Sequence, residues 1–127
     1  MKKLLFISTI LLFSTALWAQ TYQLSANIDK DCNSVPDLLS VPSGKTAYLF
    51  TIISIEAGQN CYNEKPLELG GFLIKNAQGE LIYEYKEGIN KKENLQALLD
   101  FELDAGIYMI YVQGGQGAQL ELNYQIK

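Results

Sequence analysis

The chain of 127 residues contains 10 lysines, no arginine and no histidine against 14 acidic residues, and 48% of its side chains are hydrophobic. This length suits one domain with a single core. The composition excludes histidine bases and histidine metal ligands, and the net charge of -4 argues against a nucleic-acid partner, because phosphate binding needs a cationic surface.

The N-terminal segment has the features of a secretory signal peptide. Two lysines precede an apolar run from Leu4 to Leu12, and the small residue Ala19 closes the segment. Polar residues interrupt the apolar stretch, which is short for a membrane span of about 20 residues. We therefore expect residues 1–19 to be removed. The mature domain, residues 20–127, is then secreted or periplasmic, and we expect no membrane contact after cleavage.

The two cysteines are predicted to form a structural disulfide. Export places Cys32 and Cys61 in an oxidising compartment, which favours a bridge over free thiols. Closing a loop of this length should stabilise the fold by about 3 to 4 kcal/mol on the chain-entropy model. The alternative, a redox-active or metal-binding pair, is disfavoured because the spacing is far from C-x-x-C and no other soft ligand is present.

The mature segment has the pattern of extended strands. Apolar and polar residues alternate from Tyr22 to Ile28, as in a half-buried strand. The run from Ala47 to Ile55 is apolar on both faces, which predicts a central strand covered on both sides. Five further strands are expected at Gly71–Lys75, Leu81–Lys86, Leu95–Leu103, Ile107–Gln113 and Ala118–Ile126.

The connecting segments agree with an antiparallel arrangement. Asn76–Gly79 and Asp104–Gly106 resemble short hairpin loops, and glycines 114, 115 and 117 indicate a third tight reversal. Strands at spacings near ten residues, without a strong helical pattern, predict an all-β fold. We expect a single antiparallel β-sandwich of jelly-roll or C2-like type, with about seven or eight strands and one disulfide.

Two segments allow more than one interpretation. Asn90–Glu93 resembles a capping box, so one helical turn could precede the strand that we expect from Leu95 onward. The stretch Cys32–Ser43 contains Pro36 and Pro42, which cannot donate to a ladder. We expect this stretch to be a rigid surface excursion or a short edge strand.

Catalytic motifs are absent from the sequence. No G-x-S-x-G, H-E-x-x-H or phosphate-binding glycine loop is present, and a Ser or Cys nucleophile would lack a histidine base. We therefore predict that the protein is not an enzyme and uses no cofactor. A carboxylate-dependent hydrolase remains an alternative, because the 14 acidic residues could converge in the fold.

One acidic stretch resembles a Ca²⁺ loop. Asp29, Asp31, Asn33 and Asp37 place oxygen-bearing side chains near one another. The stretch lacks the glycine and the closing glutamate of an EF-hand. Asp and Asn near a strand end also form turns, so we favour a solvated turn over a metal site.

Two tyrosines form a candidate contact surface. Tyr83 and Tyr85 share a face with Leu81 on one predicted strand. An exposed pair could stack on sugar rings or pack on a partner protein. We favour the alternative, which is core packing at a sheet edge with the hydroxyls reaching water.

The order of segments resembles that of known modules. VPSGKTAYLFTI, GGFLIKNAQGELIYE and FELDAGIYMIYVQGGQGAQLELNYQI together resemble the bacterial pre-peptidase C-terminal domain over about Val41 to Lys127. Gly71–Ile74 and Phe101–Ile110 are similar to motifs in the C2-like β-sandwich domain III of calpains. Both resemblances imply a non-catalytic accessory sandwich module.

Three functional hypotheses follow. We favour a small secreted or periplasmic, non-catalytic sandwich that binds a protein or glycan through its end loops or an exposed sheet face. A Ca²⁺-dependent or membrane-surface module of C2 type is one alternative, and a small carboxylate-dependent hydrolase is the other.

Overall fold

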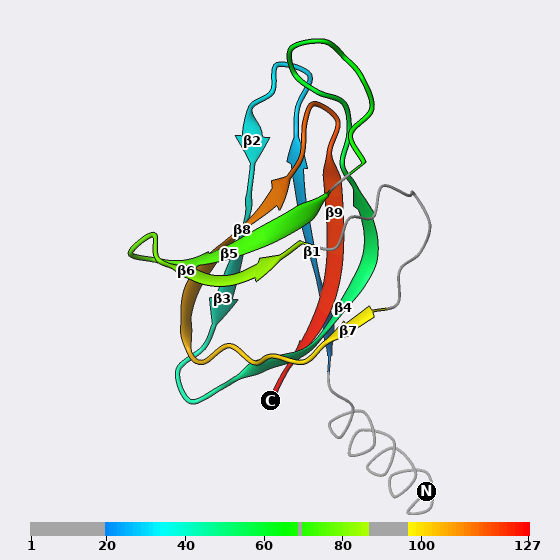
Figure 1. Ribbon diagram of the computed structural model, residues 1–127. Helices are drawn as coiled ribbons and strands as arrows, with labels where there is room; N and C mark the ends of the chain where they lie inside the picture. The colour runs from blue at the N-terminus through cyan, green and yellow to red at the C-terminus, as the bar shows by residue number, and fades with distance from the viewer. Residues whose placement is uncertain (1–19, 69, 87–96) are drawn as a thin grey trace, which may run out of the picture.

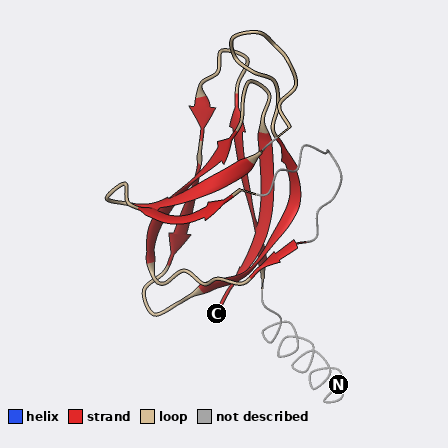
Figure 2. Cartoon of the chain, viewed as in Figure 1, coloured by secondary structure: helices blue, strands red, loops and turns tan. Residues whose placement is uncertain are grey.

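A computed structural model describes residues 20–68, 70–86 and 97–127. The predicted signal peptide and the predicted helical turn at residues 90–94 lie outside these residues. The described part is an antiparallel β-sandwich without a helix (Figure 2). The all-β sandwich prediction is confirmed. In the described ranges no helix has the length and apolar character needed to cross a membrane.

Two sheets pack face to face (Figure 1). The first sheet has the strand order β2-β1-β9-β4-β7, and the second sheet has the order β3-β8-β5-β6. The strand bounds are β1 Thr21–Ile28, β2 Ser34–Val35, β3 Asp37–Val41, β4 Ala47–Glu56, β5 Gly71–Asn76, β6 Leu81–Tyr85, β7 Ala97–Leu99, β8 Gly106–Gln113 and β9 Gln119–Ile126. The described residues form nine strands, close to the expected seven or eight, and the proline-containing stretch supplies two of them, β2 with only two residues.

The core lies between the sheets and follows the alternation seen in the sequence. Leu24 and Ala26 in β1 are buried while Ser25 is exposed, and the same pattern repeats in β9. No polar or charged residue is buried in the part of the chain that the structure describes. The largest fully buried side chains are Leu39, Phe50, Ile52, Ile55, Phe72, Ile74, Ile110, Leu120 and Leu122.

An aromatic chain of seven stacked or tilted rings runs through the interior. It connects the first sheet to the second through Phe101, whose ring lies 4.5 Å from Phe50 and 4.3 Å from Tyr83. Such pairs add to the stabilisation from burial alone. In the order in which their rings contact one another, the residues of this aromatic chain are Tyr22, Tyr124, Phe50, Phe101, Tyr83, Phe72 and Tyr85.

The prediction that the Ala47–Ile55 run is covered on both sides is wrong. Within β4, Phe50 and Ile52 are buried, whereas Leu49 is exposed and Ile53 is half-buried. The sandwich has two layers, so only one face of each sheet can reach the core. Two register shifts against β9 bend the strand, and Leu49 takes a positive φ of 53° beside one of them.

The predicted strand from Leu95 to Leu103 is only partly formed. Strand β7 covers Ala97–Leu99, and residues 95 and 96 lie outside the described ranges. The ladder ends where the Phe101 N–H donates to the Leu99 carbonyl at 3.0 Å, which turns the Phe101 ring between the sheets. Leu103 then returns to the first sheet through an isolated bridge to Ala47.

The proline-rich stretch forms edge strands, as one of the two interpretations predicts. Pro36 separates β2, at the edge of the first sheet, from β3, at the edge of the second. The Asp37 carboxylate in β3 accepts the Ser25 N–H at 2.9 Å, which ties the second sheet back to β1. The chain therefore closes one side of the sandwich by changing sheets at a proline.

Only one of the three predicted reversals is a hairpin. Asn76–Gly79 joins β5 to β6 in one sheet, with Gly79 at a φ of +81°. The segments 104–106 and 114–118 instead carry the chain between the two sheets. Alternation and turn residues do not reveal which sheet the next strand joins.

The crossing before β8 is fixed by a tyrosine. The Tyr108 hydroxyl donates to the Asp104 carbonyl at 2.8 Å. Burial, together with the nearby Asp104 carboxylate, raises the pKa of Tyr108 above its ordinary value of 10.0. The hydroxyl therefore stays protonated and can donate this bond throughout the neutral range.

Candidate functional site at the loop end

Three loops meet at one end of the sandwich, which we call the loop end: residues 29–33, 57–68 and 114–118. The first loop follows β1, the second loop follows β4, and the third loop precedes β9. These three strands are neighbours in the first sheet, so their loops are neighbours as well. The C-terminus and the start of β1 lie at the opposite end (Figure 1).

The predicted disulfide is confirmed and belongs to the loop end. Cys32 and Cys61 are bonded, with a Cα–Cα distance of 6.1 Å, and the described residues contain no free cysteine. The bond links the first loop to the second across a sequence separation of 29 residues. A disulfide of this kind is consistent with an oxidising compartment.

Glycines allow the second and third loops to lie backbone against backbone. The Gly115 N–H donates to the Ala57 carbonyl at 2.8 Å, and the Gln59 N–H donates to the Gln116 carbonyl at 2.9 Å. A Cβ added at Gly115 would overlap the Gln59 carbonyl, and one at Gly58 would overlap the Gln116 carbonyl. Only glycine permits this approach, so the loop end is held by main-chain bonds as well as by the disulfide.

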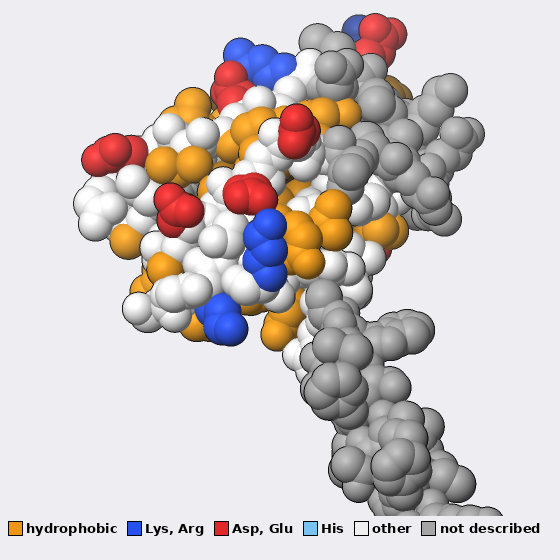
Figure 3. Space-filling view, turned by 90° about the horizontal axis from the view of Figure 1, so that it is seen from below, with side chains coloured by type: hydrophobic (Ala, Val, Ile, Leu, Met, Phe, Trp, Pro, Cys, Tyr) orange, Lys and Arg blue, Asp and Glu red, His pale blue; other side chains and the backbone are white. Residues whose placement is uncertain are grey.

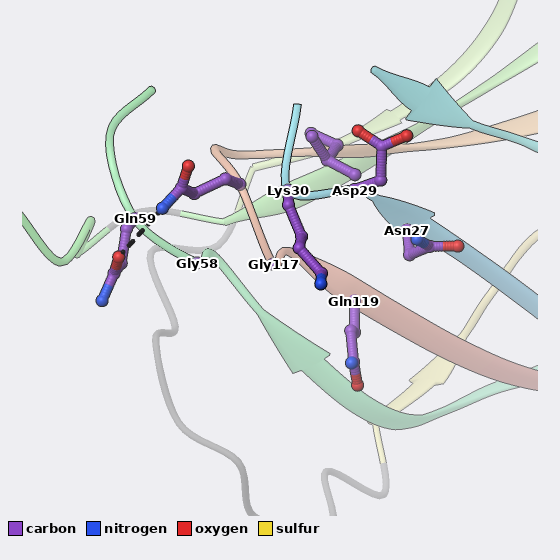
Figure 4. Close-up of a pocket in the computed structure, with 9 residues that line it drawn as sticks. Asn27, Asp29, Lys30, Gly58, Gln59, Gly117 and Gln119 are labelled. Carbon is purple, nitrogen blue, oxygen red and sulfur yellow. Dashed lines mark hydrogen bonds between the residues drawn. The ribbon is translucent and has the colours of Figure 1, made fainter. Parts of the chain in front are cut away.

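A shallow hollow of about 660 Å³ opens between these loops. Four of its nine lining residues carry side-chain amides, and Gln116 donates to Gln59 across one side at 3.2 Å. The Lys30 side chain extends toward Gln119 on the other side (Figure 4). The lining residues are Asn27, Ile28, Asp29, Lys30, Gly58, Gln59, Gln116, Gly117 and Gln119.

Amide groups suit binding better than proton transfer. Each presents donors and an acceptor but does not ionise near neutral pH. Asp29 and Lys30 are the ionisable groups among the lining residues. The hollow is therefore equipped to hydrogen-bond a polar ligand.

Tyr62 stands out at the tip of the second loop. Its side chain is 97% exposed, although the neighbouring Cys61 anchors the main chain. The Tyr62 N–H donates to the Asn60 side chain at 2.8 Å, which shapes the tip. Sequence analysis missed this residue. The sequence does contain a signal for this residue, because an aromatic side chain follows a disulfide cysteine directly and begins the polar run YNEKP.

The proposed Ca²⁺ residues form a hydrogen-bonded turn. The Asp29 Oδ1 accepts the N–H groups of Asp31 and Asn33, each at 2.9 Å. Asp37 lies apart in β3, where its carboxylate accepts the Ser25 N–H. Across residues 20–68, 70–86 and 97–127 the structure gathers no group of three or more His, Cys, Asp or Glu side chains suited to a metal. The geometry agrees with the turn interpretation.

The tyrosine pair packs into the core. Tyr85 is 9% exposed and stacks on Phe72 at 5.2 Å, while the half-buried Tyr83 packs against Phe101. The burial agrees with the favoured interpretation, core packing at a sheet edge, and does not give an exposed tyrosine pair. Leu81, on the same strand, remains 53% exposed.

Charges at the opposite end of the sandwich are dispersed. Lysine and acidic side chains are scattered among apolar and neutral ones, some of them beside a group of opposite charge (Figure 3). One ion pair lies at this end, between Lys127 and Glu102, whose side chains are both more than half exposed. Pairs of this kind contribute little, so this end offers no strong electrostatic target.

No family model, no curated protein and no solved structure matches the chain significantly. The likeness to pre-peptidase C-terminal domains and to calpain domain III thus stays a prediction.

Proposed function

We propose that the mature chain is a small, exported, non-catalytic binding module that holds a protein or glycan partner through the loop end. The supporting observation is the combination found there: a polar hollow, an almost fully exposed tyrosine and three loops fixed by a disulfide and main-chain bonds. Secretion or periplasmic export belongs to the same proposal, since the disulfide and the signal-like N-terminus both favour an oxidising compartment.

Rigidity favours binding at this end. A loop that is already ordered loses less conformational entropy when a ligand arrives. Tyr62 offers a large ring with few rotatable bonds, and tyrosine is common among residues that dominate binding energies. The surrounding amides can pair with peptide groups or sugar hydroxyls.

The proposal is tested by capture with variants of the loop end. Residues 20–127 are coupled to beads and exposed to the native culture medium or periplasmic extract, and in parallel to a glycan array. We expect Tyr62→Ala and Gln59→Ala to reduce capture at least tenfold. Gln78→Ala is the matched control, because Gln78 is an exposed glutamine in the β5–β6 turn.

Two outcomes would count against the proposal. One is the absence of any captured protein or glycan. The other is capture that Tyr62→Ala and Gln59→Ala leave at the wild-type level. Turnover of a captured glycan or peptide that is lost on replacing one acidic residue would point instead to a hydrolase.

A further inference from the structure

The outer face of the first sheet carries a grid of polar side chains. Strand β9 lies between β1 and β4, so residues paired across both ladders form rows of three. The inward residues of these strands are apolar and buried, which leaves the rows facing outward. The rows are Gln23–Asn123–Thr51, Ser25–Glu121–Ser54 and Asn27–Gln119–Glu56.

The amides of this grid have unused hydrogen-bonding capacity. Within the described part of the chain, the side chains of Gln23, Asn27, Gln119 and Asn123 make no hydrogen bond to another residue. Strands lie about 4.8 Å apart, and outward residues follow one another about every 6.7 Å along a strand. Along β1 and β9 the grid therefore repeats donors and acceptors at regular intervals, which suits a repeating ligand, whereas the register shift between Ile52 and Ser54 displaces the β4 members of the rows.

The charge of the face selects against anionic polymers. The grid contains two carboxylates, Glu56 and Glu121, and no lysine. A sulfated, phosphorylated or uronic acid chain laid along the three rows would meet the like charge of Glu56 and Glu121. The two lysines beside the face, Lys30 in the loop-end hollow and Lys127 over the Tyr48 ring, lie outside the rows. An uncharged, hydroxyl-rich chain meets no such repulsion.

Hollows lie at both ends of the same face. The loop-end hollow includes Asn27 and Gln119 from one end row (Figure 4). A second hollow of about 310 Å³ includes Thr51 and Asn123 from the row at the other end. The grid is therefore continuous with the loop end and extends it along the sheet.

The outer face of the first sheet is not wholly polar, since β4 places the exposed Leu49 and the half-buried Ile53 beside the grid, but the outer face of the second sheet carries more apolar groups. Leu38 and Ile107 are 56% and 51% exposed there, and Leu73 and Met109 are half-buried. Apolar and aromatic groups form the centres of protein interfaces, whereas amides and hydroxyls match sugar hydroxyls. Of the two outer faces, the first sheet is the one suited to a glycan.

We propose that a neutral polysaccharide binds along the outer face of the first sheet, across β1, β9 and β4, and reaches into the loop-end hollow. This inference rests on the proposed binding function and narrows its ligand class. It assigns hydrogen-bonding roles to Gln23 and Asn123, which lie outside the loop end.

Affinity electrophoresis in native gels tests the inference. Separate gels contain dextran, mannan, xylan or laminarin as neutral probes, and polygalacturonate or heparin as anionic ones. We expect residues 20–127 to be retarded by at least one neutral polysaccharide and by neither anionic one. Gln23→Ala and Asn123→Ala should each weaken that retardation at least tenfold in apparent Kd, while Gln78→Ala should not change it.

These substitutions do not alter the charge of the chain, so mobility in gels without polysaccharide serves as the internal control. Gln23→Glu provides a second test. It keeps the side-chain length at an exposed position but replaces the amide donor with an acceptor, so we expect weaker retardation, measured against the mobility of the same variant without polysaccharide, and an unchanged melting temperature.

The outcomes separate the two proposals. Absence of retardation in every neutral gel, or retardation that the grid variants do not change, would overturn the polysaccharide assignment. If a captured protein depends on Tyr62 and Gln59 but not on Gln23 and Asn123, the binding module stands and its ligand class is wrong. If neither the capture nor the gel retardation depends on Tyr62 and Gln59 or on Gln23 and Asn123, both proposals fail.

Discussion

The loop end and the aromatic chain of the interior are held together in different ways. The interior relies on apolar burial and ring contacts, such as Phe50 between Phe101 and Tyr124. The loop end relies on one disulfide and on main-chain bonds between glycine-containing loops. This difference separates stability from recognition. Changes in the aromatic chain should unfold the domain, whereas changes at the exposed loop tip should alter binding alone.

The largest effect is expected from Phe50→Ala. Phe50 is fully buried and its ring contacts two others, so the substitution leaves a cavity and should cost about 3 to 5 kcal/mol of unfolding free energy. Urea unfolding followed by fluorescence measures this loss. Tyr62→Ala is the comparison, with less than about 0.5 kcal/mol expected for an exposed surface side chain. Equal losses in the two variants would refute the proposed separation.

Removal of the disulfide should come next. The double substitution Cys32→Ser, Cys61→Ser releases a bridge across 29 residues and should lower the unfolding free energy by about 3 to 4 kcal/mol. Urea unfolding of wild type and variant, each with and without reductant, checks the value. Reductant should destabilise the wild type only. A wild type that is indifferent to reductant would contradict the role of the bridge.

Gly115→Ala tests the close approach of the loops. The added methyl group overlaps the Gln59 carbonyl, so the loops must separate at a cost of about 1 to 3 kcal/mol. Gly44→Ala is the matched control, because its Cβ meets nothing within 4 Å and only its φ of +78° is strained. Thermal unfolding compares the two. A smaller loss at Gly115 than at Gly44 would contradict the steric explanation.

The smallest effect concerns the ionisation of buried tyrosines. Burial is the main cause that raises the pKa of both Tyr108 and Tyr124, so the unfolded chain releases these protons first as the pH rises. Stability should be constant below the ordinary value of 10.0 and fall above it. Tyr108→Phe should cost about 1 kcal/mol at neutral pH through the lost bond to Asp104.

Urea unfolding at a series of pH values checks this dependence. The double variant Tyr108→Phe, Tyr124→Phe should show a shallower fall above pH 10.0 than the wild type. An equally steep fall would assign the alkaline sensitivity to other groups.

The sequence predicts what depends on local alternation and local chemistry. Leu24 and Leu122 lie inward as their period-two patterns require, and the cysteine pair forms in the expected way. The predicted coverage of β4 failed because a run with apolar residues on both faces does not reveal how many layers a fold has. Its outward Ile53 is apolar although its face meets solvent.

The candidate site was harder to predict. Tyr62 and Gln59 become functional candidates only because distant glycines bring the second and third loops together. The sequence favoured core packing for Tyr83 and Tyr85 but did not reveal the partner of Tyr83, because Phe101 reaches it after the β7 ladder has ended. Loop convergence of this kind depends on which sheet each strand joins, and local sequence carries little of that information.

The pairing of Thr21 with Gln125 has a practical consequence. Both ends of the domain leave the sandwich at one pole, while the disulfide and its neighbouring loops occupy the other (Figure 1). A tag, fusion partner or sensor surface attached at either end would therefore display the opposite pole outward. Ligands could then be screened against the domain in either orientation of the linker without blocking Tyr62.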